Sequence, residues 1–309
     1  MKLDNQDYKL LSYLYHNNRE SLTKIAKACR LSREQVDYKI KKYLSEGLIK
    51  KFLTVFSYNK LGYNCFVTLF INLKNNSLIN NFFESLKENK NCISFGKMFG
   101  EYDAYINLIF KDEKEFSENL DRILDNYADN YLVIKPYHAE MFPLKFLKYK
   151  EEENILVTGD EKEKIDDKDK LILKALEENG RARLIDIAKK AGISSELALH
   201  KLRRLYKNKI ILGHRIQFNM EKLGYSFSEI TLNIKNKKQI ERFARNHKHV
   251  NSLIFSMTRP NCIIQLFHKT HEELKDTIKD IKQLLRNENL DIKIILVEEE
   301  NKINTLPFI

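Results

Sequence analysis

Apolar residues recur at helical spacing in three short segments at the start of the chain. Asp4 is placed to cap the first of these helices. Ser32, with Gln35 three residues later, predicts a capping box at the start of a third, longer helix, and Gly47 is suited to end it. Residues 48–56 are β-prone and suit the strand of a wing. Two short helices, a tight turn and a longer third helix predict a helix-turn-helix.

The same pattern occurs a second time. When the sequence is shifted by 162 positions, residues 3–63 align with residues 165–225 without a gap, and 19 of 61 positions are identical. An ungapped match of this length with matched periodicity indicates an internal duplication. A second helix-turn-helix is therefore predicted in the second half of the chain.

Each helix-turn-helix is followed by a β-α-β-β-α-β pattern, which predicts a ferredoxin-like unit. The first pattern covers strands 66–73, 92–99, 104–110 and 131–137 and helices 78–89 and 116–127. The second covers strands 227–234, 251–257, 262–268 and 291–297 and helices 238–246 and 272–286. One sheet face of each unit lacks helices, so we expect the two sheets to pack against each other within the chain. The alternating strand residues expected on that face are Phe66, Thr68, Phe70, Ile106, Leu108 and Phe110.

These patterns predict an α+β chain in which two winged helix-turn-helix domains alternate with two βαββαβ domains. The winged helix-turn-helix domains are placed at residues 1–64 and 165–226. The sheet domains are placed at 65–147 and 227–309. Residues 148–164 are acidic and lack periodicity, which predicts a linker.

Positive charge is concentrated in the two helix-turn-helix segments. Residues 1–64 hold 13 Lys and Arg against 6 Asp and Glu, and residues 165–226 hold 14 against 8. Residues 65–150 hold 11 against 12, although the whole chain has a formal net charge of +11. This segregation predicts a polyanionic partner for the helix-turn-helix segments, and double-stranded DNA is the partner that the motif fits.

A helical wheel divides the third helix of each copy into a buried and an outward face. In the first copy Val36, Ile40, Tyr43 and Leu44 point inward. Outward side chains that can read base edges or neutralise phosphates form the candidate DNA-binding set. In the first copy, with its strand, they are Arg33, Glu34, Gln35, Tyr38, Lys41, Lys42, Lys50 and Lys51. In the second copy they are Ser195, Glu196, His200, Arg203, Arg204, Lys207 and Arg215.

Motifs for other chemistry are weak. The chain has no glycine-rich nucleotide loop, and its four cysteines are far apart without a CxxC pair, which favours a reducing cytosol over a disulfide scaffold or zinc ribbon. Cys29 is expected to be a small core residue. No apolar run predicts a membrane span.

Two polar groupings are expected to be solvated. The His247–His249 and His268–His271 pairs have no cysteine nearby, so we expect no metal site there. The run Glu298–Glu300 is expected to follow the last strand in solvent. No cofactor is predicted.

The chain resembles the Lrp/AsnC family of transcription regulators. The resemblance rests on Leu3-Asp4, Ile25-Ala26, Leu31-Ser32 and Leu61-Gly62, and on the turn Gly100-Glu101-Tyr102-Asp103, which is similar to the family's Gly-x-Tyr-Asp turn. It covers nearly the whole chain, twice. The family joins a winged helix-turn-helix to a ligand-sensing βαββαβ (RAM) domain and dimerises through that domain. The resemblance therefore implies a cytoplasmic, sequence-specific DNA-binding regulator that forms a pseudo-dimer in one chain and allows further pairing between chains.

The resemblance also implies an amino-acid effector held by Gly100, Tyr102 and Asp103. The second copy has Thr258-Arg259-Pro260-Asn261 at that turn, so the effector is expected in the first copy only. The second copy also has Lys209 where the family has glycine after the third helix, and there Asn208 is expected to take the left-handed conformation.

Two other functions are compatible with the same scaffold. Siroheme decarboxylases resemble this family, and they typically carry an aromatic and His-containing segment in the middle strands. The equivalent segments here, residues 94–109 and 253–267, contain no His. The third interpretation is a dimerisation module whose helix-turn-helices no longer bind DNA.

Overall fold

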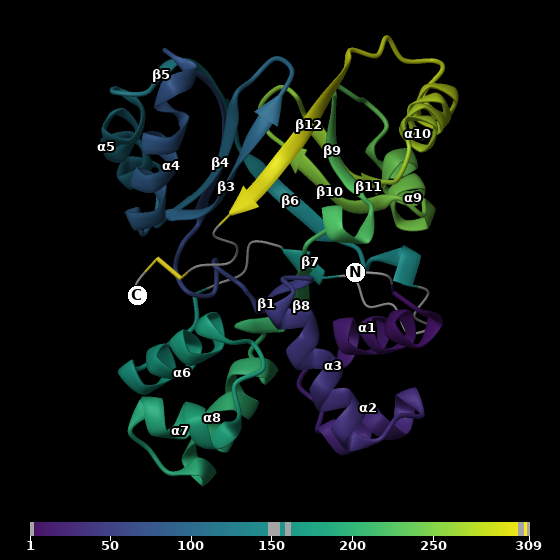
Figure 1. Cartoon of the computed structure of the whole chain (residues 1–309). Helices are drawn as coiled ribbons and strands as arrows, with labels where there is room; N and C mark the ends of the chain where they lie inside the picture. Colours follow the sequence, from purple (N-terminus) through teal and green to yellow (C-terminus); the bar gives the residue numbers. More distant parts are fainter. Residues whose placement is uncertain (1–2, 148–154, 158–161, 302–305, 308–309) are drawn as a thin grey trace. The chain divides into compact units, whose positions relative to one another are not determined.

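The computed structural model of the chain describes residues 3–147, 155–157, 162–301 and 306–307 (Figure 1). They fold as two compact units. The helical unit comprises Met1–Ser57, Leu144–Glu152 and Glu163–Gly224. The sheet unit comprises Tyr58–Pro143, Glu153–Lys162 and Tyr225–Ile309. The two helix-turn-helix segments thus fold together in one unit, and the two βαββαβ segments fold together in the other.

The helical unit contains both predicted helix-turn-helix motifs. In the first, the elements are α1 (Asn5–Asn17), α2 (Leu22–Cys29), α3 (Arg33–Ser45) and strand β1 (Ile49–Phe56). In the second they are α6 (Asp167–Glu178), α7 (Leu184–Ala191), α8 (Ser195–Lys207) and strand β8 (Ile211–Phe218). The short 3-10 turns η2 (Lys145–Leu147) and η3 (Glu221–Leu223) also belong to this unit.

The predicted helix starts are confirmed by the hydrogen bonds of their caps. The Asp4 side chain accepts from the Asp7 backbone N–H at 2.7 Å, and the Ser32 hydroxyl accepts from the Gln35 N–H at 3.1 Å. Reciprocal bonds complete a capping box at both helices. Cys29 is 1% exposed, as predicted for a core residue, whereas Leu44 is 41% exposed and not buried as predicted. Leu44 is one position past the Val36–Ile40–Tyr43 stripe, so it turns away from the core.

The ends of α3 and α8 use equivalent positions. Gly47 has φ +65°, and its equivalent Lys209 has φ +54°. The expectation that Asn208 takes the left-handed conformation is wrong, because Asn208 has φ −81°. In each copy the backbone N–H of the left-handed residue donates to a carbonyl of the last helical turn. Gly47 donates to Leu44, and Lys209 donates to Tyr206. This pattern requires the left-handed residue at position 209, at a steric cost of about 1 kcal/mol for a side chain with a Cβ.

The predicted wing strands pair with each other. Strands β1 and β8 form a two-stranded antiparallel sheet, with Phe52 opposite Ile216 and Leu53 opposite Arg215. The strand after each helix-turn-helix therefore pairs with its repeat rather than folding back as a wing hairpin of its own copy. This pairing joins the two motifs in one unit.

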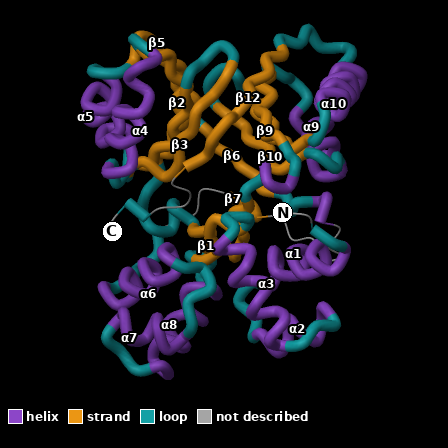
Figure 2. Tube along the Cα trace, viewed as in Figure 1, coloured by secondary structure: helices purple, strands orange, loops and turns teal. Residues whose placement is uncertain are grey.

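The sheet unit contains both βαββαβ patterns in one ten-stranded sheet, which confirms the predicted α+β fold (Figure 2). The first sheet half comprises β2 (Cys65–Leu73), α4 (Ile79–Glu88), β3 (Cys92–Phe99), β4 (Ala104–Phe110), α5 (Glu113–Leu124) and β5 (Ala128–Ile134), with the short turn η1 (Asn76–Leu78). The second sheet half comprises β9 (Ser226–Leu232), α9 (Lys237–Asn246), β10 (Val250–Ser256), β11 (Cys262–His268), α10 (His271–Leu284) and β12 (Ile292–Asn301).

The strand order β5-β2-β4-β3-β12-β9-β11-β10-β6-β7 places the two halves edge to edge at β3 and β12. The predicted strand at 131–137 is split in the structure. Strand β5 ends at Ile134, and β6 (Pro136–Met141) crosses to pair with β10 of the other half. Most of the predicted linker, 148–154 and 158–161, lies outside the described residues, but residues 155–157 form a strand, β7 (Ile155–Val157), beside β6.

Three apolar cores hold the sheet unit together. Helices α4 and α5 cover one core of the first half, and α9 and α10 cover the equivalent core of the second half (Figure 1). Helix-free strand faces from both halves share a third core that includes Phe70, Tyr105 and Ile263. Ile106, Leu108 and Phe110 were expected on this shared face and instead lie in the core under α4 and α5, because the alternation of β4 is offset by one residue.

Candidate nucleic-acid interface

The outward faces of α3 and α8 carry most of the predicted DNA-binding residues. On α3 and β1 the residues Arg33, Glu34, Gln35, Tyr38, Lys41 and Lys50 are exposed, and Lys42 and Lys51 are half-buried. On α8 the residues Ser195, Glu196, His200, Arg203 and Lys207 are exposed. Tyr38 is 66% exposed and contributes a large flat side chain to the first face. The two helices thus present hydrogen-bonding and basic groups to solvent, which is the chemistry that reads bases and neutralises phosphates.

Three predicted residues have partners inside the protein. Arg215 is buried, 8% exposed, and its guanidinium lies 5.5 Å from the Tyr15 ring centroid. It belongs to β8, which pairs with β1, so its position in the strand pair turns it inward rather than toward a DNA backbone. Arg204 forms an ion pair with the buried Asp169. The Gln35 side-chain oxygen accepts from the Ser32 N–H at 2.8 Å, so only its amide N–H groups point to a partner.

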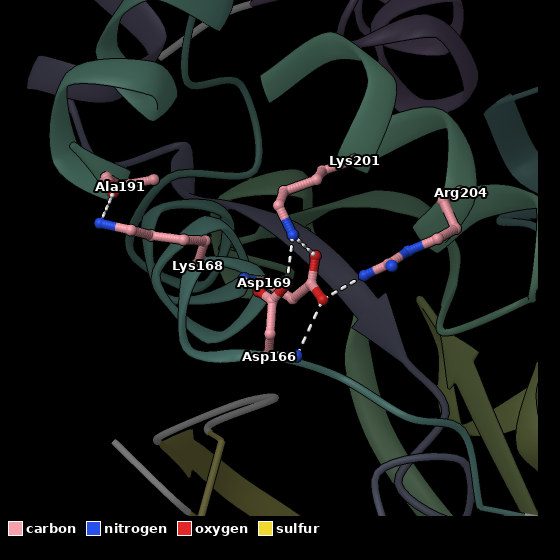
Figure 3. A network of polar contacts seen from close by, with 6 residues as sticks. All are labelled: Asp166, Lys168, Asp169, Ala191, Lys201 and Arg204. Atoms are coloured by element: carbon pink, nitrogen blue, oxygen red, sulfur yellow. Dashed lines mark hydrogen bonds and ion pairs between the residues drawn. The ribbon is translucent and has the colours of Figure 1, made fainter. Parts of the chain in front are cut away.

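A buried ion-pair network, which sequence analysis missed, fixes α8 against α6 (Figure 3). The Asp169 side chain is 0% exposed and lies 3.2 Å from Lys201 Nζ. Lys201 Nζ also lies 2.5 Å from an Asp166 oxygen, and Arg204 contacts the other Asp169 oxygen. The hydrogen bond from Lys201 lowers the pKa of Asp166 to about 2. The network therefore ties α8 to the start of α6.

The first copy contains the equivalent pair. Lys39 Nζ and the Tyr43 hydroxyl each donate to Asp7 Oδ1 at 2.6 Å. Burial by itself raises the pKa of Asp7, but these two hydrogen bonds outweigh it and lower the pKa to about 2. Asp7 and Lys39 are identical to Asp169 and Lys201 in the repeat, and this identity was the sequence signal for the pair.

Two equivalent arginines bind reciprocally across the helical unit. Arg19 donates to the carbonyls of Gly180 and Ala182, at 2.6 and 3.0 Å. Its repeat Arg181 donates to the Asn18 carbonyl and, at 3.4 Å, to the Glu20 carbonyl. Each guanidinium therefore joins the turn after the first helix of the other copy, and we call this pair the arginine clasp. Arg19 and Arg181 are among the identical positions of the repeat, but nothing in their local sequence indicates this role.

The clasp lies beside a close approach of backbone to backbone. The Gly180 N–H donates to the Phe52 carbonyl at 2.8 Å, and a Cβ on Gly180 would lie 2.8 Å from the Leu53 carbonyl group. The equivalent of Gly180 in the first copy is Asn18, whose side chain donates to the Arg215 carbonyl at 3.3 Å. The β1–β8 pair, the clasp and these contacts hold the two helix-turn-helices as one body.

The predicted effector turn is built into the sheet. The Asp103 carboxylate accepts from the Leu73 N–H at 2.8 Å, and the Tyr102 ring lies 5.4 Å from the Phe70 ring. In the second half Asn261 accepts from the Ile234 N–H at 2.9 Å, the same contact at the equivalent turn. Asp103 therefore has a structural role, which is to accept a hydrogen bond from the backbone of the neighbouring strand, and Asn261 has the same role in the second half.

The histidine pairs and the glutamate run differ from expectation. His268 is 4% exposed and its Nε2 lies 2.8 Å from the Ser228 hydroxyl, so this histidine is not solvated. Glu298 belongs to β12, within the strand and not after it, and it pairs with Lys97 at 2.8 Å. No group of three or more His, Cys, Asp or Glu placed for a metal occurs in the described part of the chain. Within the same residues no helix is both long enough and apolar enough to cross a membrane.

Comparison with known proteins identifies the helix-turn-helix segments. A winged helix-turn-helix DNA-binding family matches residues 3–50 and again residues 165–211, which confirms the duplication. The chain is 42% identical over 67 residues to the HTH-type transcriptional regulator LrpA of Pyrococcus horikoshii. It is 26% identical over 144 residues, 45% of this chain and 97% of the relative, to an uncharacterised HTH-type transcriptional regulator of Pyrococcus furiosus. The LrpA match covers 22% of this chain and spans about half, 48%, of that relative's length.

A solved structure shares the fold of nearly the whole chain. The crystal structure of the siroheme decarboxylase NirDL superposes with a TM-score of 0.65, covering 98% of this chain and 94% of that chain at 12% sequence identity. At this identity the likeness shows the fold alone. From the two family matches and the repeated architecture, the chain is a tandem duplication with a winged helix-turn-helix at the start of each half, and it is similar in sequence to Lrp-type transcriptional regulators.

Proposed function

We propose that the protein is a sequence-specific DNA-binding transcription regulator. The observation that carries the proposal is the pair of basic recognition helices, α3 and α8, held together in one compact unit by β1–β8 and the arginine clasp. A regulator with one helix-turn-helix per chain needs a second chain to present two recognition helices to DNA. Here one chain supplies both.

The DNA contacts that we propose follow the exposed residues. Lys41 and Lys50 of the first copy and Arg203 and Lys207 of the second neutralise phosphates or reach base edges. Tyr38 and His200 occupy equivalent outward positions at the centre of the two helices. Their other neighbours on the faces are Arg33, Glu34, Gln35, Lys42, Lys51, Ser195 and Glu196. Arg215, which is buried, and Arg204, which pairs with Asp169, are not assigned to DNA.

The two faces differ in chemistry, so the operator is expected to be asymmetric. His200 stands where the first copy has Tyr38, and Arg203 stands where it has Lys41. An arginine can bind guanine through two hydrogen bonds, whereas a lysine acts as a point charge. Gln35, with its oxygen in the capping box, keeps only its N–H donors for a base, and its equivalent Leu197 is 43% exposed and apolar. Each such difference is worth about 1–3 kcal/mol per base pair, enough to distinguish the half-sites.

Selection of bound sequences from random DNA tests this function. We expect two unlike half-sites, and an affinity whose logarithm falls with the logarithm of salt concentration with a slope of about −5 to −7, for about 6–8 phosphate contacts. Arg203→Ala is expected to reduce the sequence preference at one half-site and to cost about 1–3 kcal/mol of binding free energy. Lys114→Ala is the control, because it removes an exposed charge from α5 of the sheet unit and should change nothing.

Absence of binding to any duplex, together with an absorbance change when an iron tetrapyrrole is added, would favour the decarboxylase interpretation. Absence of both would favour a dimerisation module. A perfect palindrome selected by the monomeric chain would contradict the asymmetric operator while leaving DNA binding intact.

The finer part of the proposal is an amino-acid effector at Gly100, Tyr102 and Asp103. Tyr102 and Asp103 are half-buried, so the turn is open to solvent on one side. The test is calorimetry with amino acids on Asp103→Asn, which keeps the acceptor for the Leu73 N–H, as Asn261 does in the second half. We expect binding to fall at least about tenfold while the fold is kept, because an amide cannot pair with an ammonium group as a carboxylate does. Unchanged binding would remove Asp103 from the site.

A further inference from the structure

Three equivalent positions on the helix-free sheet faces carry polar side chains in both halves. In the first half, Thr68 of β2 and Ser94 of β3 both lie opposite Asn107 of β4. In the second half the same register places Glu229 of β9 and Ser252 of β10 opposite Gln265 of β11. All six residues belong to the middle of a ten-stranded sheet whose helix-free faces share an apolar core.

The first trio is closed and neutral. The Thr68 hydroxyl donates to the Asn107 side-chain oxygen at 2.6 Å, and the Asn107 amide donates to the Ser94 hydroxyl at 2.8 Å. Each hydroxyl and the amide therefore find a partner within the trio. Buried polar groups that are satisfied in this way cost the fold little.

The second trio has a carboxylate where the first has a threonine. The Ser252 hydroxyl donates to the Gln265 oxygen at 2.5 Å, and the Gln265 amide donates to Glu229 Oε1 at 2.7 Å. Glu229 is 4% exposed, and its second oxygen, Oε2, has no hydrogen-bond partner in the part of the chain that the structure describes. The row of hydrogen bonds from Ser252 through Gln265 thus ends at the Glu229 carboxylate, and one oxygen of that carboxylate still lacks a donor.

A second buried polar group belongs to the same helix-free face. Tyr105 of β4 is 3% exposed, and Glu300 is its side-chain partner there, as a hydrogen-bonding group and as a negative charge. Tyr105 pairs with Gly96, and Gly96 pairs with Glu300 of β12, so no side chain separates the phenol from Glu300. Burial and the negative charges of Glu300 and Glu229 raise the pKa of Tyr105. Burial raises the pKa of Glu229 to about 7. The hydrogen bond from Gln265 acts in the opposite direction, and the negative charge of Glu300 adds to the rise.

The missing component is a positively charged donor. A buried carboxylate oxygen without a donor destabilises the fold, because the charge has lost its hydration and gained nothing in its place. A primary ammonium group offers three N–H donors and one positive charge. It can donate hydrogen bonds to carboxylate oxygens and to a phenolic oxygen at the same time. A hard divalent cation prefers about six to eight oxygen ligands, more than this face offers.

We propose that the helix-free face around Glu229 binds a small primary ammonium compound, with Glu229 as the anchoring carboxylate and Glu300 and Tyr105 as its neighbours. The anchoring carboxylate is found in the second half alone, because the equivalent position in the first half is Thr68. The proposed site uses none of the residues Gly100, Tyr102 and Asp103, and it does not depend on the function proposed above.

Thermal unfolding and calorimetry of the full chain without DNA test the site. The probes are methylammonium and putrescine, with tetramethylammonium as a cation that has no N–H donor. We expect the two amines to raise the melting temperature with concentration, as binding to the folded state requires, and tetramethylammonium to leave it unchanged. In Glu229→Gln the affinity for the amines is expected to fall at least about 30-fold, because the charge pair is lost.

Two further variants control for folding and for general charge effects. Glu229→Thr copies the residue that the first half uses at this position, and it should fold and lose amine binding. Glu298→Gln removes a carboxylate of β12 that is exposed and paired with Lys97, and it should bind amines as the unaltered chain does. Equal stabilisation of the Glu229 variants and the unaltered chain, stabilisation by Mg²⁺ in place of amines, or no response to any amine would each overturn the proposal.

Discussion

Asp169→Ala is expected to lower the free energy of unfolding of the helical unit by about 3–5 kcal/mol. The Asp169 carboxylate is fully buried and is the partner of both Lys201 and Arg204. Removing it takes away one of the two carboxylate partners of Lys201, whose side chain is 10% exposed, and leaves the ammonium group with the more exposed Asp166 alone. Arg204, at 41% exposed, can turn outward, so the penalty falls mainly on Lys201.

Urea unfolding followed by circular dichroism measures this loss, and hydrogen exchange locates it to α6 and α8. Asp167→Ala is the matched control, because Asp167 is 90% exposed and pairs with Lys170 at the surface, where an ion pair is worth about 0–1 kcal/mol. The double variant Asp169→Leu with Lys201→Met should recover most of the loss, since no buried charge is left unpaired. A loss below about 1 kcal/mol in Asp169→Ala would show that the network does not hold α8 in place.

The double variant Arg19→Ala with Arg181→Ala is expected to weaken binding to the complete operator by at least about 30-fold, a loss of about 2 kcal/mol. The clasp donates charged hydrogen bonds to four backbone carbonyls in the turns of the opposite copies, and each such bond contributes about 1.5–3 kcal/mol to stability. Without them the two recognition helices keep only the β1–β8 pair and its neighbouring contacts. DNA must then order their relative position, which costs free energy on binding.

Two controls separate the clasp from a general loss of positive charge. Arg183→Ala removes an arginine from the same turn, but Arg183 is exposed and pairs with Asp186 at 2.7 Å on the surface, so affinity should change little. Arg19→Lys with Arg181→Lys keeps both charges and should still lose affinity, because a lysine cannot donate in a fork to two carbonyls. Full affinity in the lysine variant would mean that charge alone, and not the clasp, supports DNA binding.

Local patterns determined the elements of this protein. The helix starts at Asp4 and Ser32 follow from side chains that bond to a backbone N–H three residues away, so neighbours in sequence decide them. Periodicity identified the strands and helices of both sheet halves, and the repeat of residues 3–63 at 165–225 identified two helix-turn-helices. The outward faces of α3 and α8 were also predictable, because a helix of known phase exposes every residue away from its apolar stripe.

The tertiary structure alone decided which partners these elements take. Arg215 reads as a basic strand residue, but the pairing of β8 with β1 turns it inward, and β-strand registers join residues far apart in sequence. Arg19 and Arg181 were identical in the repeat, yet their reciprocal bonds required the two copies to fold face to face. The same holds for Glu229. Its place in a strand was predictable, but its missing donor follows from its burial in the ten-stranded sheet, which depends on long-range packing that local sequence does not encode.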